Sequence, residues 1–276
     1  MNKLHDEIAS ILSTSEINGG KYWSRKDGNI HAPHGYSTID VLNTLGEIGL
    51  KFDESKLIQD TIDFIFLYLD ENGCFKYSPK SPKLPCITAR ILTAFGRLGY
   101  KNYPRIEKCY KYFLETQKED GGWRCPTVKL GKSPQTDASN PGTTLYILDA
   151  FRFRLNSKSD IEKLNKGVLF LLKHWETRRP LGPCEFGIGS RFLSIEYPFL
   201  RYNLFYYIYV LSHYRIAQKD HRFIEAKTRL IEKSKNNRIF PETPHKSWSN
   251  FSFARKNKVS KIATKRFQEI IRSKKE

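Results

Sequence analysis

Residues 91–126, ILTAFGRLGYKNYPRIEKCYKYFLETQKEDGGWRCP, contain two helical runs and the turn that follows them. In residues 91–100 the apolar side chains recur at the i, i+3, i+4 spacing of a helix, and Gly99 stands near the end, where a helix cap is expected. A second run with the same period occupies residues 105–119, and the sequence Asp-Gly-Gly-Trp follows at 120–123. The stretch therefore predicts a helical hairpin that ends in a turn with an aromatic side chain.

The same pattern occurs elsewhere in the chain, which predicts a repeat protein. Similar first helices are expected at 41–50 and 147–156, similar second helices at 57–71 and 161–176, and turns with an aromatic residue at 70–77 and 178–187. Residues 8–23 read as a second helix with its turn, and a further pair is expected at 197–217 and 221–235. Because one hairpin cannot bury its own apolar face, each must pack against its neighbours. We predict an all-α fold.

The pattern of apolar residues also suggests how the hairpins are arranged. First helices such as residues 203–211, NLFYYIYVL, are apolar nearly all round, which is typical of a helix buried on all sides. This favours an α/α toroid of about four to five hairpins, with an inner and an outer ring of helices, over an open solenoid. We assign residues 1–240 to the toroid and residues 241–276 to a basic C-terminal extension.

The extension holds many more Lys and Arg than acidic residues. Its apolar residues fall at helical spacing, which predicts an amphipathic helix with a basic outer face; they are Val259, Ile262, Ala263, Phe267, Ile270 and Ile271. Two interpretations remain open. The helix either docks on the body with its charged face in solvent, or it contacts an anionic membrane surface or nucleic acid.

Composition limits the class of protein. The chain has 276 residues, of which 39% are hydrophobic, enough for a globular core. No run is long and apolar enough for a membrane span or a signal peptide, and five irregularly spaced cysteines suit reduced thiols, so we expect a soluble cytoplasmic protein. The net charge of +18 would attract anionic lipid, phosphorylated small molecules or nucleic acid, and nucleic acid is the partner we favour least. Nothing in the sequence indicates the oligomeric state.

The turn at 120–123, preceded by Gln117, resembles the Gln/Trp repeat of squalene and other triterpene cyclases. The alternation of helices over residues 4–235 resembles the toroid that these cyclases share with protein prenyltransferase β subunits. Residues 186–214, FGIGSRFLSIEYPFLRYNLFYYIYVLSHY, resemble small bacterial and archaeal prenyltransferase/squalene-cyclase repeat proteins. The resemblance implies a transferase or cyclase that binds a hydrophobic, possibly isoprenoid substrate in a central cavity. The Asp-rich motifs of both classes of terpene cyclase are absent from this chain.

In such a toroid, four residues would lie at one end of the ring, near the starts of successive inner helices: His34, Cys86, Cys125 and Cys184. Imidazole nitrogen and thiolate sulfur are the ligands of tetrahedral zinc. Prenyltransferases and lanthipeptide cyclases use zinc in a toroid to activate a thiol, so the resemblance implies a possible zinc site. The alternative is that these cysteines are small buried apolar side chains, as free cysteines often are.

Weaker candidates for the cavity wall complete the expected site. Asp137 and Asn140 lie near a helix start whose free N–H groups could bind a diphosphate, although they could equally serve as helix caps. Arg191 could pair with a phosphate or with a nearby carboxylate. Tyr197 could shield a carbocation with its ring, or it could belong to the core. Two hypotheses follow: an enzyme acting on a hydrophobic substrate, or a non-catalytic binding module for a protein, nucleic acid or anionic membrane surface.

Overall fold

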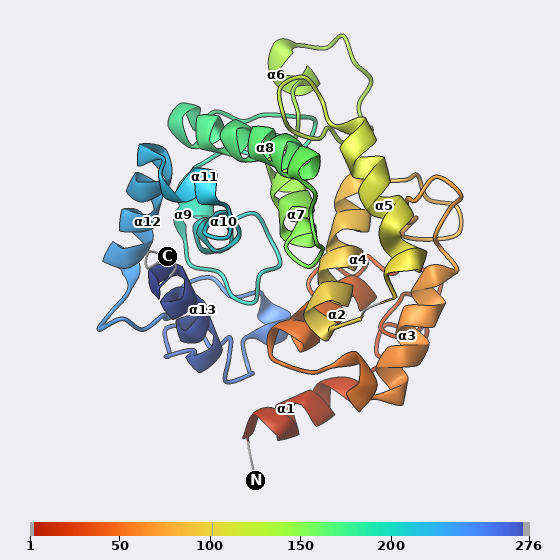
Figure 1. The fold of residues 1–276 in the computed structure, drawn as a ribbon. Coiled ribbons are helices and arrows are strands. Elements are labelled where there is room, and N and C mark those ends of the chain that lie inside the picture. The colour runs from red at the N-terminus through yellow and green to blue at the C-terminus, as the bar shows by residue number, and fades with distance from the viewer. Residues whose placement is uncertain (1–2, 101, 273–276) are drawn as a thin grey trace. The chain divides into compact units, whose positions relative to one another are not determined.

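The computed structural model describes residues 3–100 and 102–272, and within these ranges the protein is built from helices and loops without a β-strand (Figure 1). The all-α prediction is confirmed. The chain divides into two compact units, of which the first ends at Glu115 and the second begins at Thr116. No helix in the described ranges is long and apolar enough to cross a membrane.

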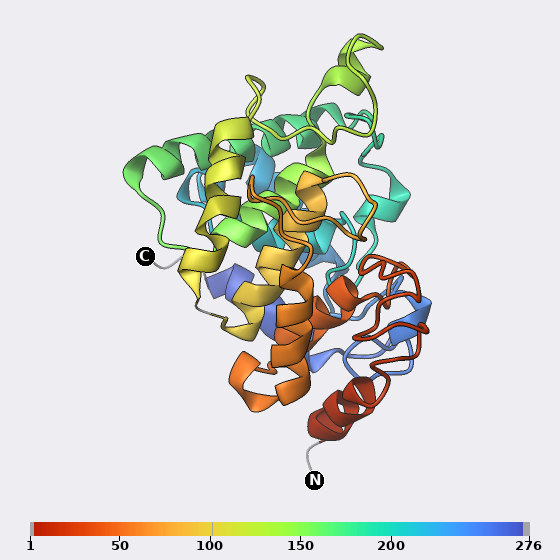
Figure 2. The same ribbon diagram turned by 90° about the vertical axis from the view of Figure 1, so that its right-hand side faces the viewer.

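The first unit contains α1 (Lys3–Leu12), α2 (Thr38–Glu47), the 3-10 helix η1 (Phe52–Glu54), α3 (Lys56–Phe66), α4 (Pro85–Leu98) and α5 (Tyr103–Thr116), at whose end the division falls. Long irregular segments precede α2 and α4 (Figure 2). Helices α2 and α4 pack closely, and every residue of α2 is buried. Gly46 permits this approach, because a Cβ atom there would lie 2.7 Å from the Cβ atom of Arg97 on α4.

The second unit contains α6 (Pro134–Asp137), α7 (Pro141–Phe151), α8 (Lys158–Thr177), α9 (Ser190–Leu193), α10 (Leu204–Leu211), α11 (Arg215–Gln218), α12 (His221–Lys233), the 3-10 helix η2 (Lys246–Trp248) and α13 (Lys261–Arg272). All residues of α7 and α10 are buried, whereas α8 and α12 each have an exposed face. Helices α7 and α8 pack together, as do α10 and α12. Within this unit, the expected contrast between buried and half-exposed helices is present.

The predicted helix limits hold best where a cap fixes them. Helix α4 ends at Gly99, which adopts a left-handed conformation with φ of 76°, and α7 begins at Pro141 after the N-cap residue Asn140. The repeated segment 147–156 covers only the end of this helix and continues past its last residue, Phe151, because the apolar period alone does not show where a helix starts and stops.

The turn at 120–123 attaches the chain to α8. Gln117 Nε2 donates hydrogen bonds to Gly121 O at 2.7 Å and to Lys163 O at 2.8 Å. The Trp123 ring is buried next to Gly167 of α8. The Gln/Trp turn is therefore structural: its polar residues satisfy backbone groups while its indole fills the core.

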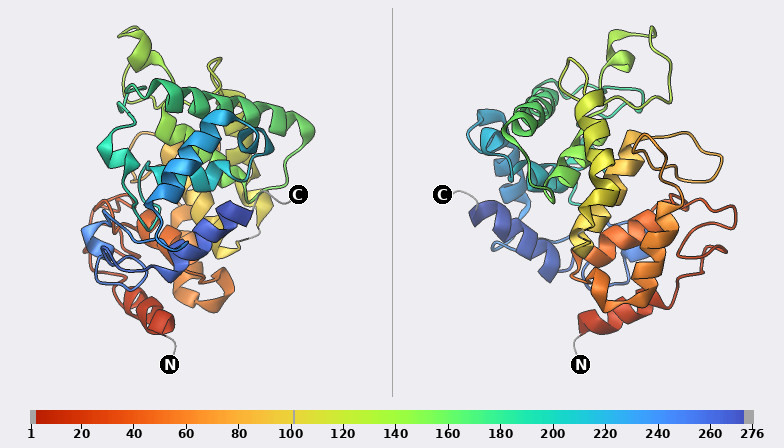
Figure 3. Two further views of the ribbon diagram at one scale, coloured as in Figure 1. Left: turned by 90° about the vertical axis from the view of Figure 1, so that its left-hand side faces the viewer. Right: turned by 45° about the vertical axis from the view of Figure 1, so that its right-hand side comes forward.

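The C-terminal helix α13 docks on the second unit (Figure 3). Ala263, Phe267 and Ile270 are buried, and Lys227 on α12 donates a hydrogen bond to the carbonyl of Ile270 at 2.8 Å. This is the docked amphipathic helix that the sequence predicted. Its apolar face is already covered, so only its charged face is open to a partner.

Candidate functional site

The thiols of Cys125 and Cys184 meet in the second unit, where they form a side-chain hydrogen bond. Cys125 is 2% exposed, whereas Cys184 lies at the surface. The Cys125 sulfur also lies 3.4 Å from Thr127 Oγ1. Contact with the Cys125 thiol, together with burial, raises the pKa of Cys184 far above its usual value. The structure thus brings together two of the predicted site cysteines, one buried and one accessible.

Backbone contacts hold these cysteines in place. Asn140 N donates to Trp123 O at 2.9 Å, which fixes the loop that carries Cys125 against the start of α7. Leu181 and Phe186 exchange two backbone hydrogen bonds of 3.0 and 3.1 Å, which close a tight turn around Cys184. Gly182, at φ of 75°, supplies the left-handed conformation that this turn requires.

Asn140 is the third polar group at this site. Its side chain is fully buried and forms a side-chain hydrogen bond with the Cys184 thiol. The turn of Cys184 presses against it, since a Cβ atom on Gly182 would lie 2.0 Å from Asn140 Oδ1. Asn140 lowers the pKa of the Cys184 thiol, whereas burial raises it. The buried Asn140 amide therefore helps to position the Cys184 thiol.

Aromatic side chains surround the same region. Phe186 packs edge-on to Tyr202 at 5.5 Å between ring centroids, and a Cβ atom on Gly142 would touch the Phe186 ring. The Tyr202 hydroxyl donates to His174 Nδ1 at 2.9 Å, and His174 Nε2 donates to Arg179 O at 3.0 Å. Burial lowers the pKa of His174 to about 4, so the imidazole is neutral and structural. Phe186, two residues after Cys184, therefore packs in an apolar, aromatic environment.

Among the described residues, no contact joins the other candidates of the second unit to Cys125 or Cys184. Asp137 ends α6 and accepts from Gly131 N at 2.9 Å, so it acts as a loop cap. Arg191 is exposed on the short helix α9. Tyr197 is fully buried with its ring 5.2 Å from that of Phe199, as expected for a core residue. The roles proposed for these three residues stay predictions.

In the first unit, His34 is exposed and Cys86 is half-buried as the second residue of α4. Near them lies a cluster that the sequence reading missed. The His31 ring centroid is 6.2 Å from that of His34 and 6.2 Å from that of Tyr77, and His31 Nδ1 is 3.5 Å from Arg90 Nη1. Burial, followed by the charge of Arg90, lowers the pKa of His31 to about 4.

Asp40 on α2 is the hydrogen-bond acceptor that holds this cluster together. It is fully buried and accepts hydrogen bonds from Gly35 N at 2.6 Å, Ser37 Oγ at 2.8 Å and Arg90 Nη2 at 2.5 Å. Burial alone would raise the pKa of Asp40, but the Arg90 guanidinium outweighs it and lowers that pKa. The signal in the sequence was an arginine in the apolar run 85–98 and an aspartate within a capping box, neither of which reveals its partner.

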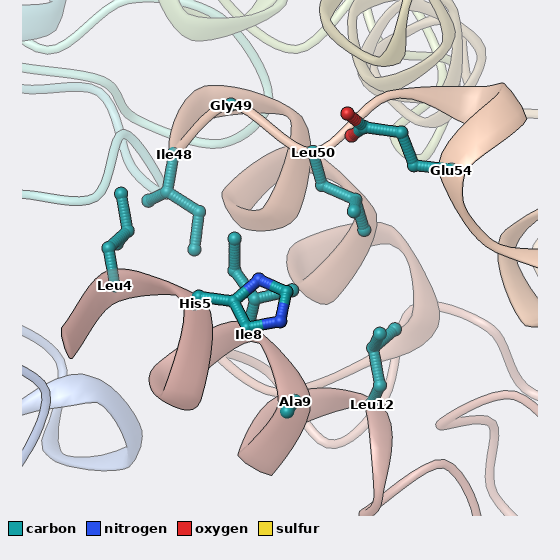
Figure 4. A pocket seen from close by; sticks show the side chains of 9 residues that line it. All are labelled: Leu4, His5, Ile8, Ala9, Leu12, Ile48, Gly49, Leu50 and Glu54. Atoms are coloured by element: carbon teal, nitrogen blue, oxygen red, sulfur yellow. The ribbon is translucent and has the colours of Figure 1, made fainter. Parts of the chain in front are cut away.

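An apolar groove lies in the first unit between α1 and the residues after α2 (Figure 4). It has a volume of about 540 Å³. Leu4, Ile8 and Leu12 face Ile48 and Leu50 across it, with His5 and Glu54 as its polar groups. Its size and lining are those of a site for a small hydrophobic molecule.

No group of three or more His, Cys, Asp or Glu side chains in residues 3–100 and 102–272 is arranged to hold one metal ion. No protein-family model matches the chain, and no curated protein matches it. The site must therefore be interpreted from its own chemistry.

Proposed function

We propose that the protein is a terpenoid-cyclase/prenyltransferase-like enzyme of the α/α-toroid type, with Cys125 and Cys184 at its reactive centre. Its substrate is a hydrophobic molecule, for which an isoprenoid is our candidate. The observation that carries the proposal is the contact between a buried and an exposed thiol beside the buried amide of Asn140.

Zinc is the cofactor we propose. Two adjacent sulfur atoms match its preference for thiolate ligands and supply half of a tetrahedral set. Cys125 and Cys184 would hold the ion, whereas the other two ligands expected from the sequence, His34 and Cys86, belong to the first unit. When bound, zinc supplies Lewis acidity that lowers the pKa of a coordinated thiol or water. The chain itself contributes the turn that holds Cys184, followed by the aromatic residue Phe186.

Metal analysis of the purified full chain tests this proposal. We expect zinc in the purified protein and its loss in Cys125→Ala and Cys184→Ala. Cys74→Ala is the matched control, because Cys74 is buried in the first unit and is no predicted ligand. Zinc-free protein, or variants that keep their zinc, would contradict the proposal. Release of diphosphate from added isoprenoid diphosphates then tests for transferase or cyclase activity.

A second candidate function is a binding module that docks on an anionic surface in the cytoplasm. The observation that favours it is the exposed basic segment at the C-terminus. Lys256, Lys258, Lys261 and Lys265 are all exposed, and none forms an ion pair with a described residue. Binding to anionic lipid vesicles should weaken as salt is raised. Charge reversal at Lys261 and Lys265 should abolish it, whereas no binding to vesicles at low salt would contradict this function.

A further inference from the structure

One wall of the apolar groove in the first unit is a row of aliphatic side chains (Figure 4). Leu4, Ile8 and Leu12 recur every four residues of α1, so they lie on one face of that helix. The row is about 12 Å long at the rise of an α-helix, which is the length of an extended chain of about ten carbon atoms. Ile48 and Leu50 form the opposite wall. The groove therefore matches a linear alkyl chain in length and in lining.

Part of this aliphatic surface is still open to solvent. Leu4, Ile8 and Leu12 are each half-buried, although Ile11 of the same helix is fully buried. A bound alkyl chain would cover the exposed parts of these side chains, and the removal of apolar surface from water favours binding.

The groove also has an acidic group, which is unexpected in so basic a protein. The chain carries a net charge of +18. Among the described residues, however, no Lys or Arg lines the groove, and Glu54 is its only carboxylate. This carboxylate lies on the Leu50 side of the groove (Figure 4). Lys51 N donates a hydrogen bond to Glu54 Oε2 at 2.7 Å, whereas Oε1 accepts none from a described residue. Glu54 can therefore accept a hydrogen bond from a ligand.

We infer that this groove binds an amphiphilic cation, a linear alkyl chain with a primary ammonium group at one end. The alkyl chain lies along Leu4, Ile8 and Leu12, and the ammonium group donates a hydrogen bond to Glu54. The positive charge of the ligand complements the carboxylate. A fatty acid of the same length meets the same aliphatic wall, but its own carboxylate is repelled by Glu54, so it should bind more weakly.

The inference goes beyond the proposed function and is independent of it. Every described residue that lines the groove belongs to the first unit, whereas Cys125 and Cys184 belong to the second. The two proposals therefore fail separately. A protein without zinc can still bind the amine, and a protein that binds zinc can lack affinity for it.

Isothermal titration calorimetry of the full chain at low salt compares three probes with the same alkyl chain: decylamine, decanol and decanoate. The measurement is made at about pH 8, where imidazole is uncharged. We expect decylamine to bind about two- to fivefold more tightly than decanol, as an exposed ion pair allows, and decanoate to bind least tightly. The net charge of the chain alone would give the opposite order. Each CH₂ group removed from decylamine should weaken binding about two- to fourfold.

Variants locate the contacts. Glu54→Gln keeps an acceptor for Lys51 N but removes the charge, so decylamine should lose its advantage over decanol. Asp53→Asn is the matched control, because Asp53 is exposed beside Glu54 and does not line the groove. Ile8→Asn should weaken the binding of all three probes, and Ser10→Asn, on the exposed side of α1, should leave it unchanged.

Four results would overturn the inference. Decylamine could fail to bind the unmodified chain, or decanoate could bind as tightly as decylamine. The advantage of decylamine could survive Glu54→Gln, or Asp53→Asn could abolish it as fully as Glu54→Gln does.

Discussion

Arg90 on α4 donates a hydrogen bond to Asp40 on α2 over 2.5 Å, and both side chains are withdrawn from solvent. A buried ion pair contributes little net stability, but removal of one partner leaves an uncompensated charge. The pair thus joins α2 and α4, and each helix depends on the other for the partner of its buried charge.

Loss of Arg90 should therefore be strongly destabilising. We expect Arg90→Met to lower the free energy of unfolding by about 3–5 kcal/mol, because it leaves the Asp40 carboxylate buried and without its main partner. Urea unfolding measures this loss. Arg25→Met is the matched control, since the Arg25–Asp27 pair is exposed and such pairs contribute about 0–1 kcal/mol. Equal losses in the two variants would contradict the role given to the buried pair.

Stability should fall as the pH is lowered from about 6.5 to about 4. Burial lowers the pKa of His31, His174 and His213 from 6.5 to about 4. In this range the unfolded chain binds protons that the folded chain excludes, so acid favours unfolding. The effect is complete below about pH 4. For the fully buried His174 the difference amounts to about 3 kcal/mol.

The free energy of unfolding, measured by urea titration at several pH values, tests this dependence. His174→Gln keeps a hydrogen-bonding side chain that does not titrate in this range, so its stability should depend less on pH than that of the unmodified chain. An unchanged slope between pH 6.5 and 4 would show that His174 is not held neutral.

The Gln/Trp turn should tolerate no side chain at Gly121. This residue has φ of 90°, and an added Cβ atom would lie 2.6 Å from Lys166 O. Gly131 has a similar φ of 86°, but an added Cβ atom there would meet open space. The variant Gly131→Ala therefore measures the cost of the backbone strain alone. We expect Gly131→Ala to cost about 1–2 kcal/mol and Gly121→Ala several kcal/mol, because the second change also forces the turn away from α8. Thermal unfolding compares the two. Similar melting temperatures would contradict the packing argument.

The apolar groove should bind a hydrophobic probe. Ile8→Asp places a charge in the groove next to Leu50 and should reduce the binding of a fluorescent fatty acid at least tenfold. Ser10→Asp is the control, since Ser10 is exposed on the same helix and does not line the groove. If both variants bind the probe as the unmodified chain does, the groove is not the binding site.

Local signals in the sequence predicted much of the fold. Gly99 and Pro141 mark helix limits through backbone constraints that act on one residue, and the apolar period of α4 reflects burial of the helix itself. The Asp40–Arg90 pair was missed because a charged residue in an apolar helix shows that a partner exists without showing which one it is. The contact between Cys125 and Cys184 joins two loops that α7 and α8 separate in the sequence, so no local signal indicates it.

Cobalt substitution tests the central claim, a thiolate metal site at Cys125 and Cys184, most directly. Co²⁺ added to the reduced, metal-free chain should give a near-ultraviolet thiolate-to-cobalt band and intense visible bands of a tetrahedral ion, which one equivalent of zinc should remove. Cys184→Ala and Cys125→Ala should weaken the thiolate band, and Cys74→Ala should leave it unchanged. No thiolate band in the unmodified chain, or a band that both site variants retain, would contradict the account.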